Sequence, residues 1–259
     1  MIEPFARLGY SSKAVIYFTT GLLAVAAATG QGGRVTDTSG ALRELLSRPF
    51  GHIILVALGI GLCGYAIWRF LDAWIDPDRN GTSVGGLVTR IGHVVRGVVY
   101  GALGVEAFRL SQGLKGSAPD DMERWTGRFM ELPMGTWLVG LTGLIILAYG
   151  VSQILATMKP LDKMIDVSVL PPRCRNGLVR VSRFGVGARG VLITAIGAFL
   201  VRAALMENPN EARGTRESVL ALITEFGGRW ILFAIAAGLL AYAVDQALHA
   251  RCRRITPVM

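Results

Sequence analysis

The chain has 259 residues, of which 52% are hydrophobic and 17% charged, and its mean hydropathy is positive. Soluble domains carry charge on about a quarter of their residues, so this composition excludes an ordinary soluble protein and favours a membrane protein. The formal net charge of +9 is not gathered in a basic module with interleaved aromatic residues, so we expect no nucleic acid among its partners.

A four-residue spacing recurs three times, each time inside an apolar run. A glycine is followed at intervals of four by a cation, a bulky residue and a second glycine. The copies are Gly9, Lys13, Tyr17, Gly21; Gly92, Arg96, Tyr100, Gly104; and Gly185, Arg189, Ile193, Gly197. Residues four apart stay on one face of a helix. The pattern therefore predicts three helices that pack closely through their small residues.

A second apolar run follows each of these helices and carries its own residues at constant offsets. They are Pro49, Gly51, Tyr65, Trp68, Arg69; Pro133, Gly135, Tyr149, Ser152, Gln153; and Phe226, Gly228, Tyr242, Asp245, Gln246. A register kept over this distance is typical of internal repeats. The sequence thus predicts one membrane domain made of three two-helix units, at 1–79, 80–172 and 173–259.

Six apolar segments are candidates to cross a bilayer core, which takes about 20 residues. In chain order they are 14–29, 52–73, 94–108, 136–158, 187–204 and 230–248. The third is the weakest, because only nine residues separate Arg96 from Glu106, and its repeat partners support it. The prediction is an all-α polytopic membrane protein with its three units in a pseudo-threefold arrangement.

The linker between the two spans of each unit is expected to hold a short amphipathic helix at the outer interface. These helices are predicted at 39–47, 119–130 and 215–224, where capping and acidic residues precede amphipathic spacing. Trp125, Trp137 and Trp230 fall near the same surface, where interfacial tryptophans gather.

The distribution of Lys and Arg predicts an orientation. The face that holds both termini has sixteen of them against eleven on the opposite face, and its net charge is +9 against zero. Positive charge is retained in the cytoplasm. We therefore expect both termini to be cytoplasmic in a bacterial inner membrane, with the basic linker and tail in contact with anionic lipids.

Three repeat-related cations are the main candidate site. Lys13, Arg96 and Arg189 lie about one turn into the cytoplasmic ends of their helices. If these helices surround a central axis, the cations form a ring that binds an anion or gates a path. The alternative is that they extend to the interface or form salt bridges, and Asp72 and Asp245 lie at a matching depth.

Two further polar positions stand out. Arg69 adds a cation to this layer in the first unit, where the other units have Gln153 and Gln246. Glu106 replaces apolar residues of the other copies, and a lone carboxylate in a membrane helix is a candidate proton or cation site. An ion pair with Arg109, three residues further on, explains it equally well.

Other chemistry is not expected. His93 and His249 are predicted near the cytoplasmic surface and His52 at the outer one, so no pair opposed within the bilayer is expected to bind haem. The three cysteines form no Cys-x-x-Cys pair, and nucleotide-binding and hydrolase motifs are missing. We expect no cofactor, no metal and no enzymatic activity.

The first unit carries a family resemblance. Its stretches ARLGY (6–10) and GALREL (40–45), the latter ahead of PFG (49–51), resemble the bacterial membrane family called domain of unknown function 1206. The resemblance covers nearly the whole chain, although Glu106, Ile193 and Phe226 depart from the pattern in the later units. It implies a bacterial inner-membrane protein with six spanning helices and supplies no activity.

Two functions remain open on the sequence alone. Abundant small-residue helix faces and short loops favour a scaffold or accessory subunit that packs against lipid or other membrane-protein subunits. The alternative is a small channel or transporter whose path follows the pseudo-threefold axis past Lys13, Arg96 and Arg189.

Overall fold

The computed structural model describes residues 3–30, 35–75, 84–114, 121–158, 172–226 and 228–252, and the regular structure within them is helical. The elements are α1 (Glu3–Thr29), α2 (Thr38–Leu46), α3 (Gly51–Ile75), α4 (Val84–Ser111), α5 (Asp121–Met130), α6 (Gly135–Ala156), α7 (Pro172–Leu205), the 3-10 helix η3 (Pro209–Glu211), α8 (Thr215–Phe226) and α9 (Arg229–Cys252).

Six of the described helices are long and apolar enough to cross a membrane: α1, α3, α4, α6, α7 and α9. They confirm the six predicted spans. The short helices α2, α5 and α8 lie where the sequence predicted helices in the outer linkers, although residues 119 and 120 fall outside the described part of the chain. The fold class expected from the sequence is therefore correct.

Local signals set several helix ends. The Asp37 side chain accepts a hydrogen bond of 2.8 Å from the Gly40 amide, which caps the start of α2. Gly30 and Gly113 follow α1 and α4 with φ values of 75° and 76°. This left-handed conformation ends a helix without strain only at glycine, so the same repeat position stops both helices.

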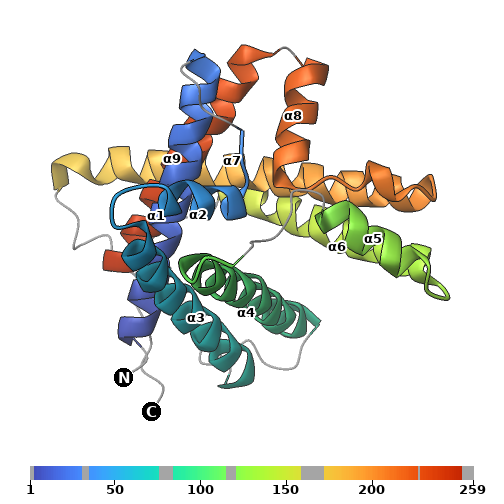
Figure 1. The fold of residues 1–259 in the computed structure, drawn as a ribbon, viewed down its shortest axis with the longest axis horizontal. Helices are drawn as coiled ribbons and strands as arrows, with labels where there is room; N and C mark the ends of the chain where they lie inside the picture. The colour runs from blue at the N-terminus through green and yellow to red at the C-terminus, as the bar shows by residue number, and fades with distance from the viewer. Residues whose placement is uncertain are drawn as a thin grey trace.

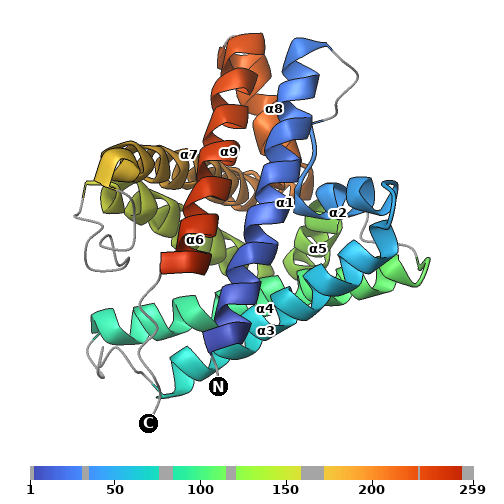
Figure 2. The ribbon, with the colours of Figure 1, turned by 90° about the vertical axis from the view of Figure 1, so that its left-hand side faces the viewer.

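The spanning helices pack as three pairs, α1 with α9, α3 with α4, and α6 with α7. Each pair joins two units: α4 of the second unit lies along α3 of the first, and α7 of the third unit lies along α6 of the second. The third pair joins α1 of the first unit to α9 of the third. The pairs run in clearly different directions, with the two ends of the chain on neighbouring elements (Figure 1 and Figure 2). Pairing between units therefore closes the three units into a ring.

Glycines of the repeat allow the helices in these pairs to approach closely. The second glycine of each copy faces the residue two positions before the repeated tyrosine on the partner helix. These contacts are Gly21 with Leu240, Gly104 with Cys63, and Gly197 with Leu147. A Cβ atom at Gly197 would stand 2.4 Å from the Leu147 backbone nitrogen, so only glycine fits there.

The first glycine of each copy faces its own unit, and here the three units differ. Gly9 packs on Tyr65 and Gly185 on Tyr242, where an added Cβ would stand 2.3 Å from the nearest atom. Gly92 has no such neighbour within 4 Å, and α4 and α6 are not among the helix pairs that pack along each other in the described residues. The pairing repeats three times, but these unequal contacts do not confirm the expected pseudo-threefold arrangement.

Side chains join the helices of a pair at one end. Arg7 donates to the carbonyl oxygens of Ala250 and Arg251 at 2.9 and 2.8 Å, at the C-terminal end of α9. Arg90, at the same position of the repeat, donates to the Ala73 carbonyl oxygen of α3 at 2.7 Å. Both arginines bind carbonyl groups that the end of a helix leaves unpaired.

The other end of the same two pairs has a matching contact. Arg229 Nε donates to the Ala28 carbonyl oxygen at 2.6 Å, and His52 Nδ1 lies 2.8 Å from the Ser111 carbonyl oxygen. Arg229 and His52 occupy one repeat position, and Ala28 and Ser111 occupy another. The α1–α9 and α3–α4 pairs are thus equivalent at both ends.

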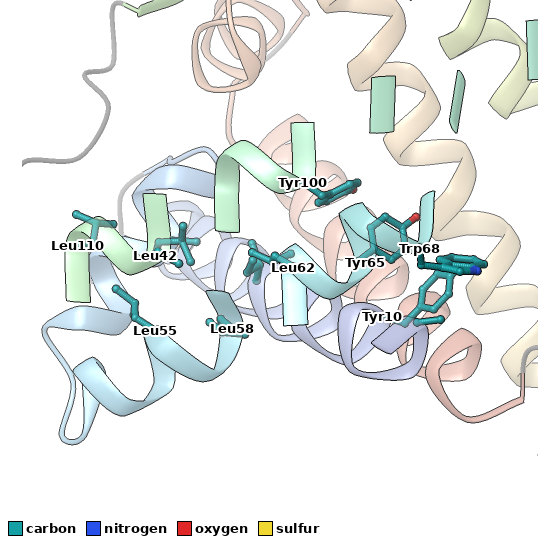
Figure 3. Packing of buried hydrophobic residues seen from close by; sticks show 13 residues of the cluster. Tyr10, Leu42, Leu55, Leu58, Leu62, Tyr65, Trp68, Tyr100 and Leu110 are labelled. Atoms are coloured by element: carbon teal, nitrogen blue, oxygen red, sulfur yellow. The ribbon is translucent and has the colours of Figure 1, made fainter. Parts of the chain in front are cut away.

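Apolar side chains are divided between the helix contacts and the outside. The buried cluster in Figure 3 runs from leucines of α2, α3 and α4 at one end to Tyr10, Tyr65 and Trp68 at the other. Large apolar residues are exposed elsewhere, as on α6 at Leu138, Leu141, Leu144 and Ile145. Such a surface suits lipid rather than water.

The glycine contacts predict a contrast between two substitutions. Gly197→Ala should destabilise the protein by about 1–3 kcal/mol, because its methyl group meets the α6 backbone. Gly92→Ala should leave stability unchanged or raise it by up to about 1 kcal/mol, because it meets open space and favours the helix. Thermal unfolding in one detergent tests both, and equal losses at the two positions would contradict the packing described.

Candidate functional site

Four cations and every tyrosine of the chain meet at the centre of the helix pairs, in what we call the cation–tyrosine layer. Its cations are Lys13 of α1, Arg69 of α3, Arg96 of α4 and Arg189 of α7. Its tyrosines are Tyr10, Tyr17, Tyr65, Tyr100, Tyr149 and Tyr242, which are all six in the sequence. The repeat delivers most of these residues, because the cation and the tyrosines hold fixed positions on its two helices.

Lys13 is enclosed within the layer, with 4% of its surface exposed. Its Nζ atom is 3.4 Å from the Tyr65 hydroxyl oxygen. The same atom lies 4.7 and 4.5 Å from the ring centroids of Tyr65 and Tyr100, within the range of cation–π attraction. Lys13 therefore points inward among aromatic rings, which does not fit the alternative that it extends to the membrane surface.

Arg189 joins helices of the first and third units. Its Nε atom is 3.4 Å from the Tyr17 hydroxyl oxygen, and its guanidinium carbon is 5.0 Å from the ring centroid of Tyr242. The Tyr17 hydroxyl in turn lies 3.3 Å from that of Tyr100. A chain of polar contacts thus runs from α7 through α1 to α4.

Arg96 faces α6. Its Nε atom donates to the Tyr149 hydroxyl oxygen at 3.2 Å, and Gln153 donates to the same oxygen at 2.6 Å. Tyr149 also lies within electrostatic reach of Arg189. Arg96 and Arg189 are both half-buried, so they keep accessible surface that Lys13 lacks.

Arg69 is the one cation of the layer that has a carboxylate partner among the described residues. It donates to Asp72 Oδ2 at 3.1 Å, and its other nitrogens donate to the hydroxyls of Tyr65 at 2.9 Å and Tyr10 at 3.0 Å. Its guanidinium carbon stacks 4.2 Å from the Trp68 ring centroid. This buried group is satisfied on every side.

The two aspartates expected to pair with the repeated cations serve other groups. Asp72 lies 3.3 Å from His93 Nδ1 as well as contacting Arg69. Asp245 accepts from Ser182 and Gln246 and lies 3.5 Å from His249 Nδ1. Neither forms an ion pair with Lys13, Arg96 or Arg189 among the described residues.

The layer consequently holds an excess of positive charge. No ion pair between Lys13, Arg96 or Arg189 and a carboxylate occurs among the described residues, while Lys13 lies within electrostatic reach of the other two and of Arg69. A buried charge without an opposite charge is costly, and aromatic rings and hydroxyls offset only part of that cost. The arrangement is chemically suited to an anion.

Glu106 lies apart from this layer. It is buried near the C-terminal end of α4, where it accepts a hydrogen bond of 2.8 Å from the Ser39 hydroxyl of α2. The described residues contain no cluster of three or more His, Cys, Asp or Glu side chains that could hold a metal ion. Glu106 therefore helps to hold α2 against α4.

Two features of the repeat were not predicted from the sequence. Arg7, Arg90 and Arg183 stand two positions before the first glycine in all three copies, and the first two bind carbonyl groups at the end of the helix with which their own helix pairs. The convergence of the tyrosines was also missed, although three of them recur at one repeat position. Comparison of the copies would have revealed both, since each is a repeated polar residue on an apolar helix.

The Arg69–Asp72 pair allows a stability test with a natural control. Asp72→Asn should destabilise the protein by about 3–5 kcal/mol, because it leaves Arg69 buried without its carboxylate. The double variant Arg69→Gln, Asp72→Ala copies the residues of the second unit, Gln153 and Ala156, and should cost less. Chemical unfolding in detergent compares them, and a double variant at least as unstable as the single one would contradict the ion-pair assignment.

Comparison with known proteins identifies relatives without an assigned activity. The family described as Domain of Unknown Function (DUF1206) matches residues 8–76, 91–159 and 184–253, one segment in each predicted unit. The chain is 33% identical over 244 residues to an uncharacterized protein of Bacillus subtilis (strain 168) named YxxB, covering 94% of this chain and 88% of that one. No solved structure matches the chain.

Proposed function

Because the chain belongs to the DUF1206 family, whose description assigns no activity, we propose a function from the cation–tyrosine layer itself. The protein binds an anion inside the membrane and passes it across as a small channel or transporter. It does so without an enzymatic step. We place it in a bacterial inner membrane with both termini cytoplasmic, in line with the charge distribution and with a bacterial relative.

The observation that carries this proposal is that the basic side chains of Lys13, Arg96 and Arg189 lie close together with no carboxylate partner among the described residues. An intramembrane cation marks a functional site when it faces the interior of a helix bundle, since it would otherwise be too costly to keep. These three occupy one repeat position and turn toward one centre, where each contacts a tyrosine hydroxyl. An incoming anion supplies the missing opposite charge.

The surrounding hydroxyls suit such a ligand. A tyrosine hydroxyl can donate to an anion when one is present and accept from a cation when none is. Tyr17 and Tyr149 are therefore able to turn their protons toward a bound anion while keeping contact with the guanidinium groups. The enclosure of Lys13 indicates a closed state, and passage requires the aromatic rings around it to move.

An accessory-subunit role is the second candidate, and α6 favours it. Most of its large apolar side chains are exposed, and the unit to which it belongs has the incomplete internal packing at Gly92. A helix of another membrane subunit could cover this side. In that case the protein would co-purify with a partner and would move no anion by itself.

Flux in liposomes tests the leading proposal. Wild-type protein should release trapped chloride or inorganic phosphate faster than empty liposomes, and Lys13→Gln or Arg189→Gln should slow release by about tenfold, a loss of about 1.4 kcal/mol of favourable interaction. Arg48→Gln is the matched control, since Arg48 forms only an exposed pair with Glu44.

Two results would count against this function. One is a wild-type flux no faster than that of empty liposomes for both anions. The other is an unchanged flux after Lys13, Arg96 and Arg189 are all replaced by glutamine. A co-purified partner together with the first result would favour the accessory role.

A further inference from the structure

We propose that the anion enters from within the membrane, through the slot between α4 and α6, and that it is the phosphate head of a lipid. We use the word slot for the uncovered side of the second unit, where a Cβ atom at Gly92 would meet open space, Val95 of α4 and Ile145 of α6 are exposed, and α4 and α6 do not pack along each other in the described residues. This proposal rests on the proposed anion site and names the ligand class. Its chemistry is a phosphodiester on acyl chains, in contrast to a free phosphate ion from solution.

The difference between the second unit and the other two can be traced to one pair of repeat positions. In the first unit Ser12 faces Gly61, and in the third Ala188 faces Gly238, so two small residues let the helices of the unit touch. The same two positions in the second unit hold Val95 and Ile145. Two branched side chains cannot occupy the space of a small pair, so α4 and α6 stay apart.

Both branched residues remain uncovered. Val95 is 54% and Ile145 60% exposed, and Gly92, one turn before Arg96, meets open space. In the other two units the corresponding glycines, Gly9 and Gly185, pack on the tyrosine of the second helix. Of the three repeat glycines, Gly92 in the second unit is therefore the one that does not pack on the second helix of its own unit.

Of the two half-buried cations, Arg96 lies on the uncovered side of the second unit, and Arg189, which also contacts Tyr17 and Tyr242, comes close to it at Tyr149. Arg96 stands next to Val95 and reaches across to Tyr149, one turn beyond Ile145, and Arg189 lies near the same tyrosine. Lys13, whose unit is closed, is enclosed by rings. The opening thus leads to two guanidinium groups that have no carboxylate partner among the described residues.

The apolar side chains at the slot and the guanidinium groups beyond it together favour one class of ligand, an anionic lipid. Branched apolar walls match acyl chains, and a pair of guanidinium groups matches a phosphate through paired N–H donors. Arg96 lies about 10 Å along α4 from Thr89, where the apolar span begins, so a headgroup needs to sink only a short way. A free hydrophilic ion gains nothing from the apolar walls, whereas an anionic lipid uses both features.

Native mass spectrometry of the purified full-length protein tests the proposal. Phosphatidylglycerol, phosphatidylcholine and inorganic phosphate are added separately to protein stripped of lipid. The wild type should retain phosphatidylglycerol about tenfold more tightly than phosphatidylcholine, and Arg96→Gln, Arg189→Gln should abolish that preference. Arg48→Gln, which alters an exposed cation, should keep it.

A second variant separates the slot from the charges. Val95→Ser, Ile145→Gly gives the second unit the small pair of the first and leaves every cation in place. It should lose the preference for phosphatidylglycerol while still binding inorganic phosphate. If that variant does not fold, the arginine variant still decides, because it leaves Val95, Ile145 and the glycine contacts of the helix pairs unchanged.

The possible failures are distinguishable. Equal retention of both lipids by the wild type, or a preference that survives loss of both arginines, overturns the lipid proposal. Phosphate flux in liposomes without lipid preference overturns it as well, but leaves the proposed anion function intact. Lipid preference without any flux supports the lipid site and argues against transport.

Discussion

Positive charge buried in an apolar environment is the constraint on which this structure depends. Each of the three copies of the repeat places one cation on an apolar helix, namely Lys13, Arg96 or Arg189. The surrounding residues of each copy must therefore offset the free-energy cost of burying that cation. The tyrosines do so by placing rings and hydroxyls around the charges. Among the described residues, the carboxylate that pairs with a cation of this layer is Asp72 of the first unit, and its partner is the extra cation, Arg69.

The helix pairs supply the close contacts that hold this layer together. Glycine brings the backbones near enough for side chains of one unit to reach the next, and the arginines at the helix ends fix the pairs lengthwise. Three units that share the same spaced residues would be expected to pack in three similar ways. The second unit is the exception, because it has Val95 and Ile145 where the other units have small residues, and both side chains are exposed. A close contact between helix backbones leaves no room for branched side chains, so this small increase in side-chain volume is enough to keep α4 and α6 apart.

The sequence was sufficient for the helices and for the faces on which they pack, because spacing by four and constant offsets are local patterns. The sequence was not sufficient to predict which side chains form ion pairs or which helices pack together. Asp72 and Asp245 have the correct depth to pair with the repeated cations, but depth along a helix says nothing of the direction around it. The pairing of α1 with α9 was also out of reach, since a small-residue face is equally suited to several helices. Gly92 shows the same limit, as its sequence position is equivalent to that of Gly9 and its surroundings are not.

The pairing of the first spanning helix with the last has a consequence for biosynthesis. Helix α1 is made before the other described helices and its partner α9 after them, so α1 must remain in the bilayer without its main contact until α9 has been made. Until then the face that carries Gly21 and the Arg7 side chain lacks the α9 groups that it binds in the folded protein. The ring therefore closes only after α9 has been inserted, and a chain that lacks α9 leaves α1 open to the wrong neighbour.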